Sequence, residues 1–106
     1  MTRMSDALPF ERVLETEHLL AFHHPRPAYP LHLLLLPKKE ISELGEISAT
    51  DQPFLMDLYA SVQQLVERFG LEASGYRLIV NGGAYQDFPR LHFHLVSGTS
   101  LDQTES

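Results

Sequence analysis

The 106-residue chain contains no cysteine, and this absence excludes disulfides, thiol nucleophiles and cysteine-ligated zinc. Long apolar runs are missing too. The longest, residues 33–36, has the length of a strand and falls far short of the roughly 18 residues of a membrane span. Residues 1–6 lack the apolar core of a signal peptide. We therefore expect a cytoplasmic protein with no membrane partner.

Basic residues are scarce, because 8 lysines and arginines stand against 14 aspartates and glutamates, for a formal net charge of -6. This balance excludes a general nucleic-acid surface, although six histidines allow a local cationic pocket. The 43% hydrophobic and 21% charged residues are typical of a globular protein. The length fits a single domain over residues 1–106 with a modest core.

Short apolar segments predict the strands. Residues 11–22 predict two short strands around a turn at residues 15–18. Residues 31–36 predict a buried strand, and the prolines of residues 23–30 predict an extended loop before it. Further strands are expected over residues 76–80 and 91–96.

A long helix is predicted from Thr50 or Asp51 to Gly70, where glycine suits a left-handed C-terminus. A short helical turn is predicted before it, capped by Ser42 and ending at Glu46. The element order indicates an α+β domain: a mostly antiparallel sheet of about five strands, one long helix and one short helix. One apolar stripe of the long helix is expected to face the core: Leu55, Leu58, Val62, Leu65, Val66 and Phe69.

Residues 90–96 alternate strictly between polar and apolar side chains. Successive side chains of a strand point to opposite faces, so Arg90, His92 and His94 form a row with neighbours roughly 6–7 Å apart. Two imidazoles and a guanidinium in one row make a compact anion site, and a neutral imidazole is a competent nucleophile near neutral pH. The apolar residues are expected to face the core: Leu91, Phe93 and Leu95.

Two other features suggest a site. His32 lies among leucines, where a polar ring needs a partner. It would complete a three-histidine cluster if its strand shares a sheet with residues 91–96; otherwise it is a core histidine with a local partner. Asn81, Gly82 and Gly83 follow a strand, and their backbone N–H groups could cradle a phosphate or form an ordinary turn.

The order and spacing of these segments resemble the histidine triad (HIT) family over about residues 10–98. The family signature alternates three histidines with apolar residues, and His92 and His94 match the second and third. The resemblance implies a HIT-like fold, a homodimer and a nucleotide ligand. Further matching segments are residues 21–23, 30–33 and 37–41, the long helix, residues 76–81, and Gln86.

The resemblance also implies a reaction: hydrolysis or transfer of nucleoside monophosphates from phosphoramidates, adenylates or dinucleoside polyphosphates, with no metal or other cofactor. His92 matches the residue that attacks the α-phosphorus, forming a nucleotidyl-histidine that water then cleaves. His94 matches the residue that hydrogen-bonds the phosphate and helps the leaving group. His32 and Asn81 match positions that line the phosphate site, and Gln86 is expected to bind the nucleotide as well.

Three positions depart from the family pattern, and all three are expected to contact the nucleotide. Arg90 replaces the first histidine; it cannot relay a proton but could clamp a phosphate. His24 replaces an acidic residue that usually holds the ribose hydroxyls. Asp87 replaces a hydroxyl-bearing residue that often touches phosphate. We hypothesise an ion pair between Asp87 and Arg90, in which case Asp87→Ser should strengthen nucleotide binding.

Other interpretations remain open. The three departures favour a nucleotide-binding or regulatory protein that has lost catalysis. His92 and His94 could also be histidines of a solvated face, and Gln86 could merely stabilise its loop. A metal-binding or purely interaction-mediating dimer is a third class, but no carboxylate or cysteine is placed for a dedicated metal site. The sequence specifies neither the base nor the leaving group.

Overall fold

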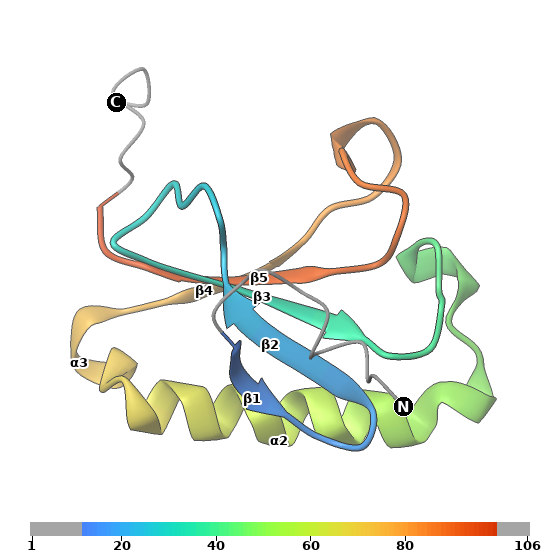
Figure 1. The fold of residues 1–106 in the computed structure, drawn as a ribbon, viewed down its shortest axis with the longest axis horizontal. Coiled ribbons are helices and arrows are strands. Elements are labelled where there is room, and N and C mark those ends of the chain that lie inside the picture. The colour runs from blue at the N-terminus through green and yellow to red at the C-terminus, as the bar shows by residue number, and fades with distance from the viewer. Residues whose placement is uncertain (1–11, 100–106) are drawn as a thin grey trace.

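A computed structural model describes residues 12–99, so the expected strand start at residue 11 lies outside the described residues. Five antiparallel strands form one sheet in the order β1-β2-β3-β5-β4, with a long helix across it (Figure 1). The predicted α+β class is confirmed. The strands are β1 (Arg12–Glu15), β2 (Leu19–His23), β3 (Leu31–Pro37), β4 (Arg77–Val80) and β5 (Phe93–Ser97). The helices are α2 (Gln52–Arg68), α3 (Leu71–Ser74) and the 3-10 turns η1 (Leu44–Glu46), η2 (Ala49–Asp51) and η3 (Gly83–Tyr85).

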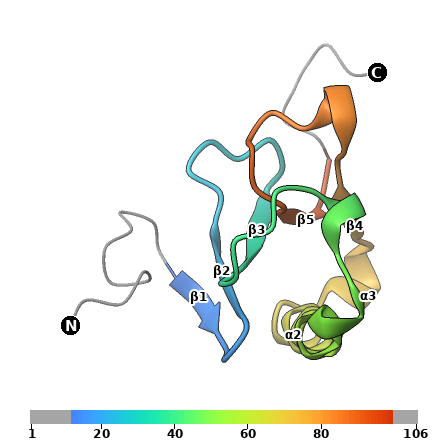
Figure 2. The same ribbon diagram turned by 90° about the vertical axis from the view of Figure 1, so that its right-hand side faces the viewer.

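The fold has two layers, because α2 covers one face of the sheet while two loops rise from the other (Figures 1 and 2). One loop joins β2 to β3, and the other joins β4 to β5 and carries η3. No helix within residues 12–99 is long and apolar enough to cross a membrane. The core between the layers contains, among others, Leu19, Ala21, Leu33, Leu35, Phe54, Leu58, Leu65, Phe93 and Leu95.

The predicted start of α2 is confirmed, because Asp51 is its N-cap residue. The backbone N–H of Ser48 donates to the Asp51 carboxylate at 3.0 Å, and Lys39 Nζ donates to the same carboxylate at 2.8 Å. The hydrogen bond from Lys39 holds the pKa of the Asp51 carboxyl below its usual range. Ser42 does not cap η1, whose N-cap is Glu43. The predicted end at Gly70 is confirmed by its left-handed φ of 64°.

The predicted apolar stripe of α2 is confirmed except at Leu55, because the other members are buried in the core or packed against it: Leu58, Val62, Leu65, Val66 and Phe69. Leu55 is 36% exposed, whereas Phe54 and Ser61 are 5% and 2% exposed. The buried positions fall four, three and four residues apart, from Phe54 through Leu58 and Ser61 to Leu65. Ser61 was missed because a small polar side chain lies where the helix approaches the sheet.

The last strand begins later than predicted. The N–H of Leu91 donates to the carbonyl of Ile41 at 2.7 Å, outside the sheet, and the ladder begins at Phe93. The predicted alternation is nevertheless confirmed, since Leu91, Phe93 and Leu95 are all at most 5% exposed. Residues 90–92 are therefore an extended segment before β5, fixed by the hydrogen bond of Leu91. They place His92 on the face of the sheet opposite α2, here called the open face.

Candidate functional site

The sheet register gathers the histidines on the face opposite α2. β3 pairs with β5, so Leu34 stands opposite His94. His32, two residues before Leu34, shares this open face. The predicted adjacency is confirmed, because His32 Nε2 and His94 Nδ1 are 2.9 Å apart. A polar ring in a leucine strand thus finds its partner across the sheet.

Backbone donors decide which nitrogen of His32 carries the proton. The N–H of Ala28 donates to His32 Nδ1 at 3.0 Å, so this nitrogen must have a lone pair. Neutral His32 is then protonated on Nε2 and donates to His94 Nδ1. Neutral His94 in turn carries its proton on Nε2. The loop between β2 and β3 therefore determines that His94 offers a hydrogen-bond donor to the open face.

His92 has the opposite tautomer. Its Nδ1 lies 2.8 Å from the carbonyl oxygen of Arg90, which can only accept, so Nδ1 is the protonated nitrogen. The Nε2 atom of neutral His92 keeps its lone pair. The rings of His92 and His94 lie 5.0 Å apart between centroids. A nucleophilic nitrogen and an N–H donor therefore stand side by side on one rigid segment.

Burial keeps the cluster neutral. It lowers the pKa of both His32 and His94 to about 4, with neighbouring histidines adding to the effect. For His94 the Asp87 carboxylate acts in the opposite direction. Both imidazoles are therefore uncharged at neutral pH.

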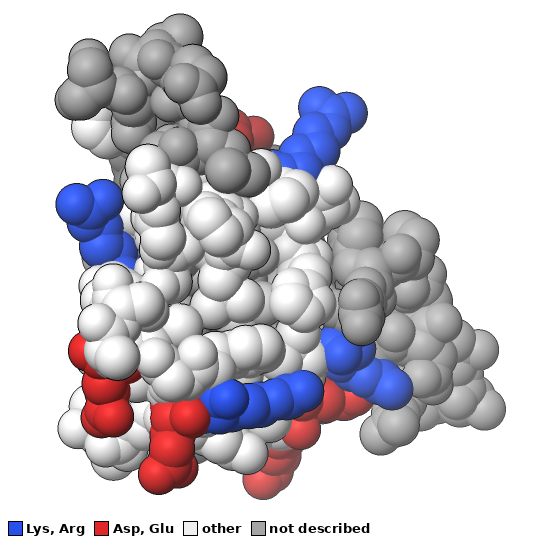
Figure 3. Space-filling model, turned by 90° about the vertical axis from the view of Figure 1, so that its left-hand side faces the viewer, with Lys and Arg blue, Asp and Glu red and all other residues white. Residues whose placement is uncertain are grey.

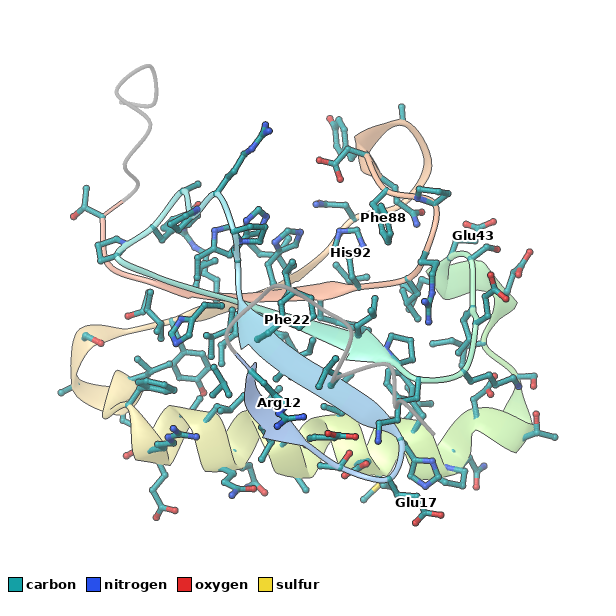
Figure 4. All side chains as sticks on the ribbon, viewed as in Figure 1. Arg12, Glu17, Phe22, Glu43, Phe88 and His92 are labelled. Carbon is teal, nitrogen blue, oxygen red and sulfur yellow. The ribbon has the colours of Figure 1, made fainter. Side chains whose placement is uncertain are left out.

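A cavity of about 460 Å³ opens beside the cluster, within the usual range for a small-molecule site. Its polar wall contains His24, Asp87, Arg90, His92 and His94. Figure 4 places His92 and Phe88 together on the side of the sheet away from α2, and their rings meet edge to face at 5.9 Å. The apolar wall was not predicted; it consists of Phe22, Pro25, Leu34, Leu36 and Phe88.

Two residues of the apolar wall lie within the run of leucines in β3, where the sequence did not distinguish them from core residues. Leu34 and Leu36 lie two and four residues after His32, so all three share a face of β3. Their even spacing from His32 along the strand is the sequence signal that would have predicted Leu34 and Leu36 as cavity residues. Phe22 stands opposite Leu34 in the β2–β3 register, which places it in the same wall.

His24 follows β2 and continues its ladder, since its N–H donates to the carbonyl of His32 at 2.8 Å. Its ring lies 4.3 Å from the His32 ring and 6.1 Å from the His94 ring. The N–H of Arg26 donates to His24 Nδ1 at 2.9 Å, so neutral His24 is protonated on Nε2. Burial lowers the pKa of His24, and the nearby Asp87 carboxylate opposes this effect.

The hypothesis of an ion pair between Asp87 and Arg90 is wrong: among residues 12–99 no ion pair joins them. Arg90 Nη2 donates instead to the carbonyl of Pro37 at 3.0 Å. No hydrogen-bond partner lies within residues 12–99 for the buried Nε of Arg90. The side chain of Arg90 thus closes one wall of the cavity, while Asp87 stays exposed at its mouth.

Asn81 and Gln86 stand apart from the cavity wall. β4 and β5 pair Ile79 with His94 and Val80 with Phe93, so Asn81 follows in register beside His92. Gln86 Nε2 donates to the carbonyls of Ser42 and Phe88 at 2.8 and 2.9 Å. In this arrangement Gln86 holds the loop that carries Phe88.

Three histidines form a candidate metal site, because ring nitrogens of His24, His32 and His94 lie within 4.8 Å of one another. A metal-bound histidine usually donates its second ring N–H to an acceptor. Here the Nδ1 atoms of His24 and His32 instead accept backbone N–H groups. Their other nitrogens then carry protons, which opposes coordination. The cluster is better suited to hydrogen bonding an anion.

Charge is distributed unevenly over the molecule. Figure 3 looks onto the end that carries α3, where acidic side chains, with basic side chains beside them, lie in the lower part of the view. The centre of this view is uncharged. The histidine cluster lies on the other side of the sheet from α2, so an anion site is compatible with a chain of net charge -6.

Comparisons with known proteins agree with this geometry. The family model of the HIT domain matches residues 6–101. A 13.2 kDa HIT-like protein of Azospirillum brasilense is 36% identical over 97 residues, covering 89% of this chain and 80% of the relative. A HIT family hydrolase from Legionella pneumophila superposes with a TM-score of 0.83 at 30% identity, covering 96% and 93% of the two chains. A histidine triad nucleotide-binding protein from Candida albicans gives 0.79 at 25% identity, covering 91% and 71%.

Proposed function

The chain belongs to the histidine triad family, and from that premise we propose that it is a hydrolase or transferase acting at the α-phosphate of nucleotides. The proposal is supported by the hydrolase and the nucleotide-binding protein among its structural neighbours. The substrate classes are those with an activated α-phosphate: nucleoside phosphoramidates, adenylates and dinucleoside polyphosphates. The site is proposed to work in the cytoplasm without a metal.

The opposite tautomers of His92 and His94 carry the proposal. The lone pair of His92 Nε2 attacks the α-phosphorus, a phosphorus–nitrogen bond forms, and the leaving group departs with its bonding electrons, an amine leaving group also taking up a proton from water. His94 Nε2–H donates to a phosphate oxygen, where charge develops in the transition state. Water then breaks the phosphorus–nitrogen bond, which releases the nucleoside monophosphate and restores His92.

The remaining residues of the cavity hold this geometry. The Arg90 carbonyl fixes the His92 ring, and His32 fixes the His94 ring. The apolar wall of the cavity, which includes Phe22 and Leu36, offers a surface for the nucleotide base. Asn81 lies beside His92 in the strand register and can make a further contact to the phosphate. Positioning of this kind is a large part of phosphoryl-transfer catalysis.

The decisive experiment is turnover of adenosine 5′-phosphoramidate by the wild type and by His92→Ala. We expect cleavage by the wild type, a loss of at least about a thousandfold in the variant, and an adenylyl adduct on His92 detectable by intact mass spectrometry. His18→Gln, on the turn between β1 and β2, is the control and should keep full activity. Wild-type turnover that survives in His92→Ala would contradict the proposal.

A nucleotide-binding protein without turnover is the second candidate, favoured by one observation. The Asp87 carboxylate lies at the cavity mouth and acts electrostatically on His94, so it opposes an incoming phosphate. Nucleotide binding by calorimetry without any cleavage or adduct would establish this candidate.

We also propose a homodimer through β4 and the adjoining side of α2. In the described sheet β4 is an edge strand, and such edges pair readily with another chain. Leu78 on this edge is 43% exposed, and Tyr59 and Tyr76, 61% and 47% exposed, line one surface hollow formed by α2, α3 and the residue before β4. Light scattering should give twice the chain mass for the wild type and one chain mass for Leu78→Lys. Leu44→Lys, at an equally exposed leucine on η1, should stay dimeric, and a monomeric wild type would refute the dimer.

A further inference from the structure

The guanidinium of Arg90 lies in the cavity wall without a counter-charge. Arg90 borders the cavity together with Leu36 and Phe88, and no carboxylate within residues 12–99 forms an ion pair with it. Its Nη2 donates to the Pro37 carbonyl at 3.0 Å, and its buried Nε has no partner within the same residues. The side chain is therefore packed into the wall, where none of the described residues neutralises its charge.

One nitrogen of this guanidinium is available to a ligand. Within the described part of the chain nothing accepts a hydrogen bond from Nη1 of Arg90, and, unlike Nε, this nitrogen is not buried. The bond from Nη2 to the Pro37 carbonyl already holds the guanidinium in place, so binding through Nη1 costs little further ordering of the side chain. Arginine has no acceptor. The ligand atom that meets Nη1 must therefore be a hydrogen-bond acceptor.

The strand register separates this donor from the phosphate position. His94 stands opposite Leu34, whereas Arg90 is anchored at Pro37, three residues and roughly 10 Å further along β3. In an in-line displacement the leaving group departs from the side of phosphorus opposite to the attacking nitrogen of His92. Arg90 precedes His92 on one extended segment and so lies on the attacking side. The part of the ligand that reaches Arg90 is therefore the nucleoside.

The base of that nucleoside is the group that fits. Leu34 and Leu36, which lie between the His94 and Pro37 positions, belong to the apolar wall proposed to hold the base. A base on this wall presents its far edge to Arg90. Guanine has two acceptors on one edge, O6 and N7, and arginine is a common partner of that edge, whereas adenine has an amino donor in place of O6. We propose that Arg90 selects nucleotides whose base carries a carbonyl oxygen on this edge, guanine in preference to adenine.

This selection rests on the proposed nucleotide function and adds a base specificity to it. It differs from the phosphate clamp that the sequence suggested for Arg90, because a clamp on the phosphate would strengthen the binding of every nucleotide alike. Reading the base instead makes the guanidinium matter for guanosine ligands and very little for adenosine ligands.

The test is calorimetric titration of the protein with the 5′-monophosphates of guanosine, inosine and adenosine. Inosine has the O6 and N7 atoms of guanosine without its 2-amino group, so it isolates the carbonyl edge. The wild type should bind the guanosine and inosine nucleotides about tenfold more tightly than the adenosine nucleotide, the effect of one hydrogen bond to a charged group. Arg90→Met, which keeps an apolar stem in the wall, should bring both ratios close to one.

Arg68→Met is the matched control. Arg68 also donates to a main-chain carbonyl, that of Val13 at 3.0 Å, but it lies outside the cavity. The variant loses the same charge and a comparable hydrogen bond, and it should keep the wild-type ratios. Unchanged affinity for the adenosine nucleotide in Arg90→Met shows that this variant is folded, and the wild-type ratios test the inference by themselves if it is not.

The outcomes separate this inference from the function on which it rests. Equal binding of the three nucleotides by the wild type, or a preference that survives in Arg90→Met, overturns the base selection alone. A preference for guanosine that inosine does not share overturns it too, because the 2-amino group would then be the group recognised. Equal weakening of all three ligands in Arg90→Met would replace it with a phosphate clamp. Failure of the wild type to bind any of them overturns the base selection and the proposed function together.

Discussion

The Nε2 atom of His32 and the Nδ1 atom of His94 lie 2.9 Å apart although 62 positions separate the residues in the chain. This contact links the tautomers of the two rings. The Ala28 N–H donates to His32 Nδ1, so His32 carries its proton on Nε2 and donates to His94, which then carries its own proton on Nε2. The hydrogen bonding of the open face thus depends on one backbone N–H group in the loop between β2 and β3.

Nuclear magnetic resonance can observe these tautomers directly. In neutral protein labelled with nitrogen-15, we expect His92 to be protonated on Nδ1, and His32 and His94 on Nε2, as their partners require. Two-bond correlations of the imidazole rings distinguish the two forms. Finding the same tautomer in His92 and His94 would contradict the assignment of nucleophile and donor.

The protein should lose stability in mild acid. Burial holds the pKa of His32 and His94 near 4, below the 6.5 expected in an unfolded chain. As pH falls below about 6.5 the unfolded chain binds protons first, so stability that is complete above this value is lost progressively toward about 4. The melting temperature should therefore fall between about pH 7 and about pH 5, where most carboxylates remain ionised.

Substitution of one buried histidine tests whether the cluster causes this loss of stability in acid. His94→Gln should have a smaller fall in melting temperature over the same range, whereas His18→Gln should follow the wild type. Equal slopes for all three proteins would show that the cluster does not titrate as its burial requires.

Arg90→Ala should keep most of its activity. His92 is held by the main-chain carbonyl of Arg90, which alanine also carries, so turnover should stay within about tenfold of the wild type. The lost bond to the Pro37 carbonyl should cost about 1 kcal/mol in stability. Arg68→Ala, which loses a comparable bond to the Val13 carbonyl, is the matched control. Near-complete loss of turnover in Arg90→Ala alone would mean that the guanidinium itself takes part.

Gly98→Ala should be strongly destabilising. Gly98 has a φ of 94°, and a Cβ there would lie 2.8 Å from Pro30 Cγ. We expect the free energy of unfolding, measured by chemical denaturation, to fall by about 1–3 kcal/mol. Gly82→Ala is the control, because Gly82 has a φ of -138° and open space around it, so the same substitution should change stability little. Equal effects at the two glycines would refute this account.

Local patterns in the sequence predicted most of the fold and part of the site. Strict alternation placed His92 and His94 on the open face, because a strand's side chains follow a period of two whatever lies around them. The helix stripe was predicted correctly except at Leu55, which is exposed. Buried Ser61 was missed because it is polar, yet it is small enough to pack there.

The remainder of the site depends on contacts between distant loops. No local pattern shows that the side chain of Arg90 turns to Pro37 or that Asp87 and His24 line the same cavity. These placements follow from the 3-10 turn of η3 and the three prolines between β2 and β3, whose paths are set by packing. Reading His32, Leu34 and Leu36 as one face would have recovered the apolar wall.

The carbonyl that orients His92 belongs to the main chain, and every amino acid carries one. Substitution at position 90 can therefore change the wall of the cavity while the carbonyl that orients the His92 ring stays in place. The wall of the cavity and the orientation of the His92 ring thus depend on different atoms of one residue, the side chain and the main chain of Arg90, so the two can be altered separately.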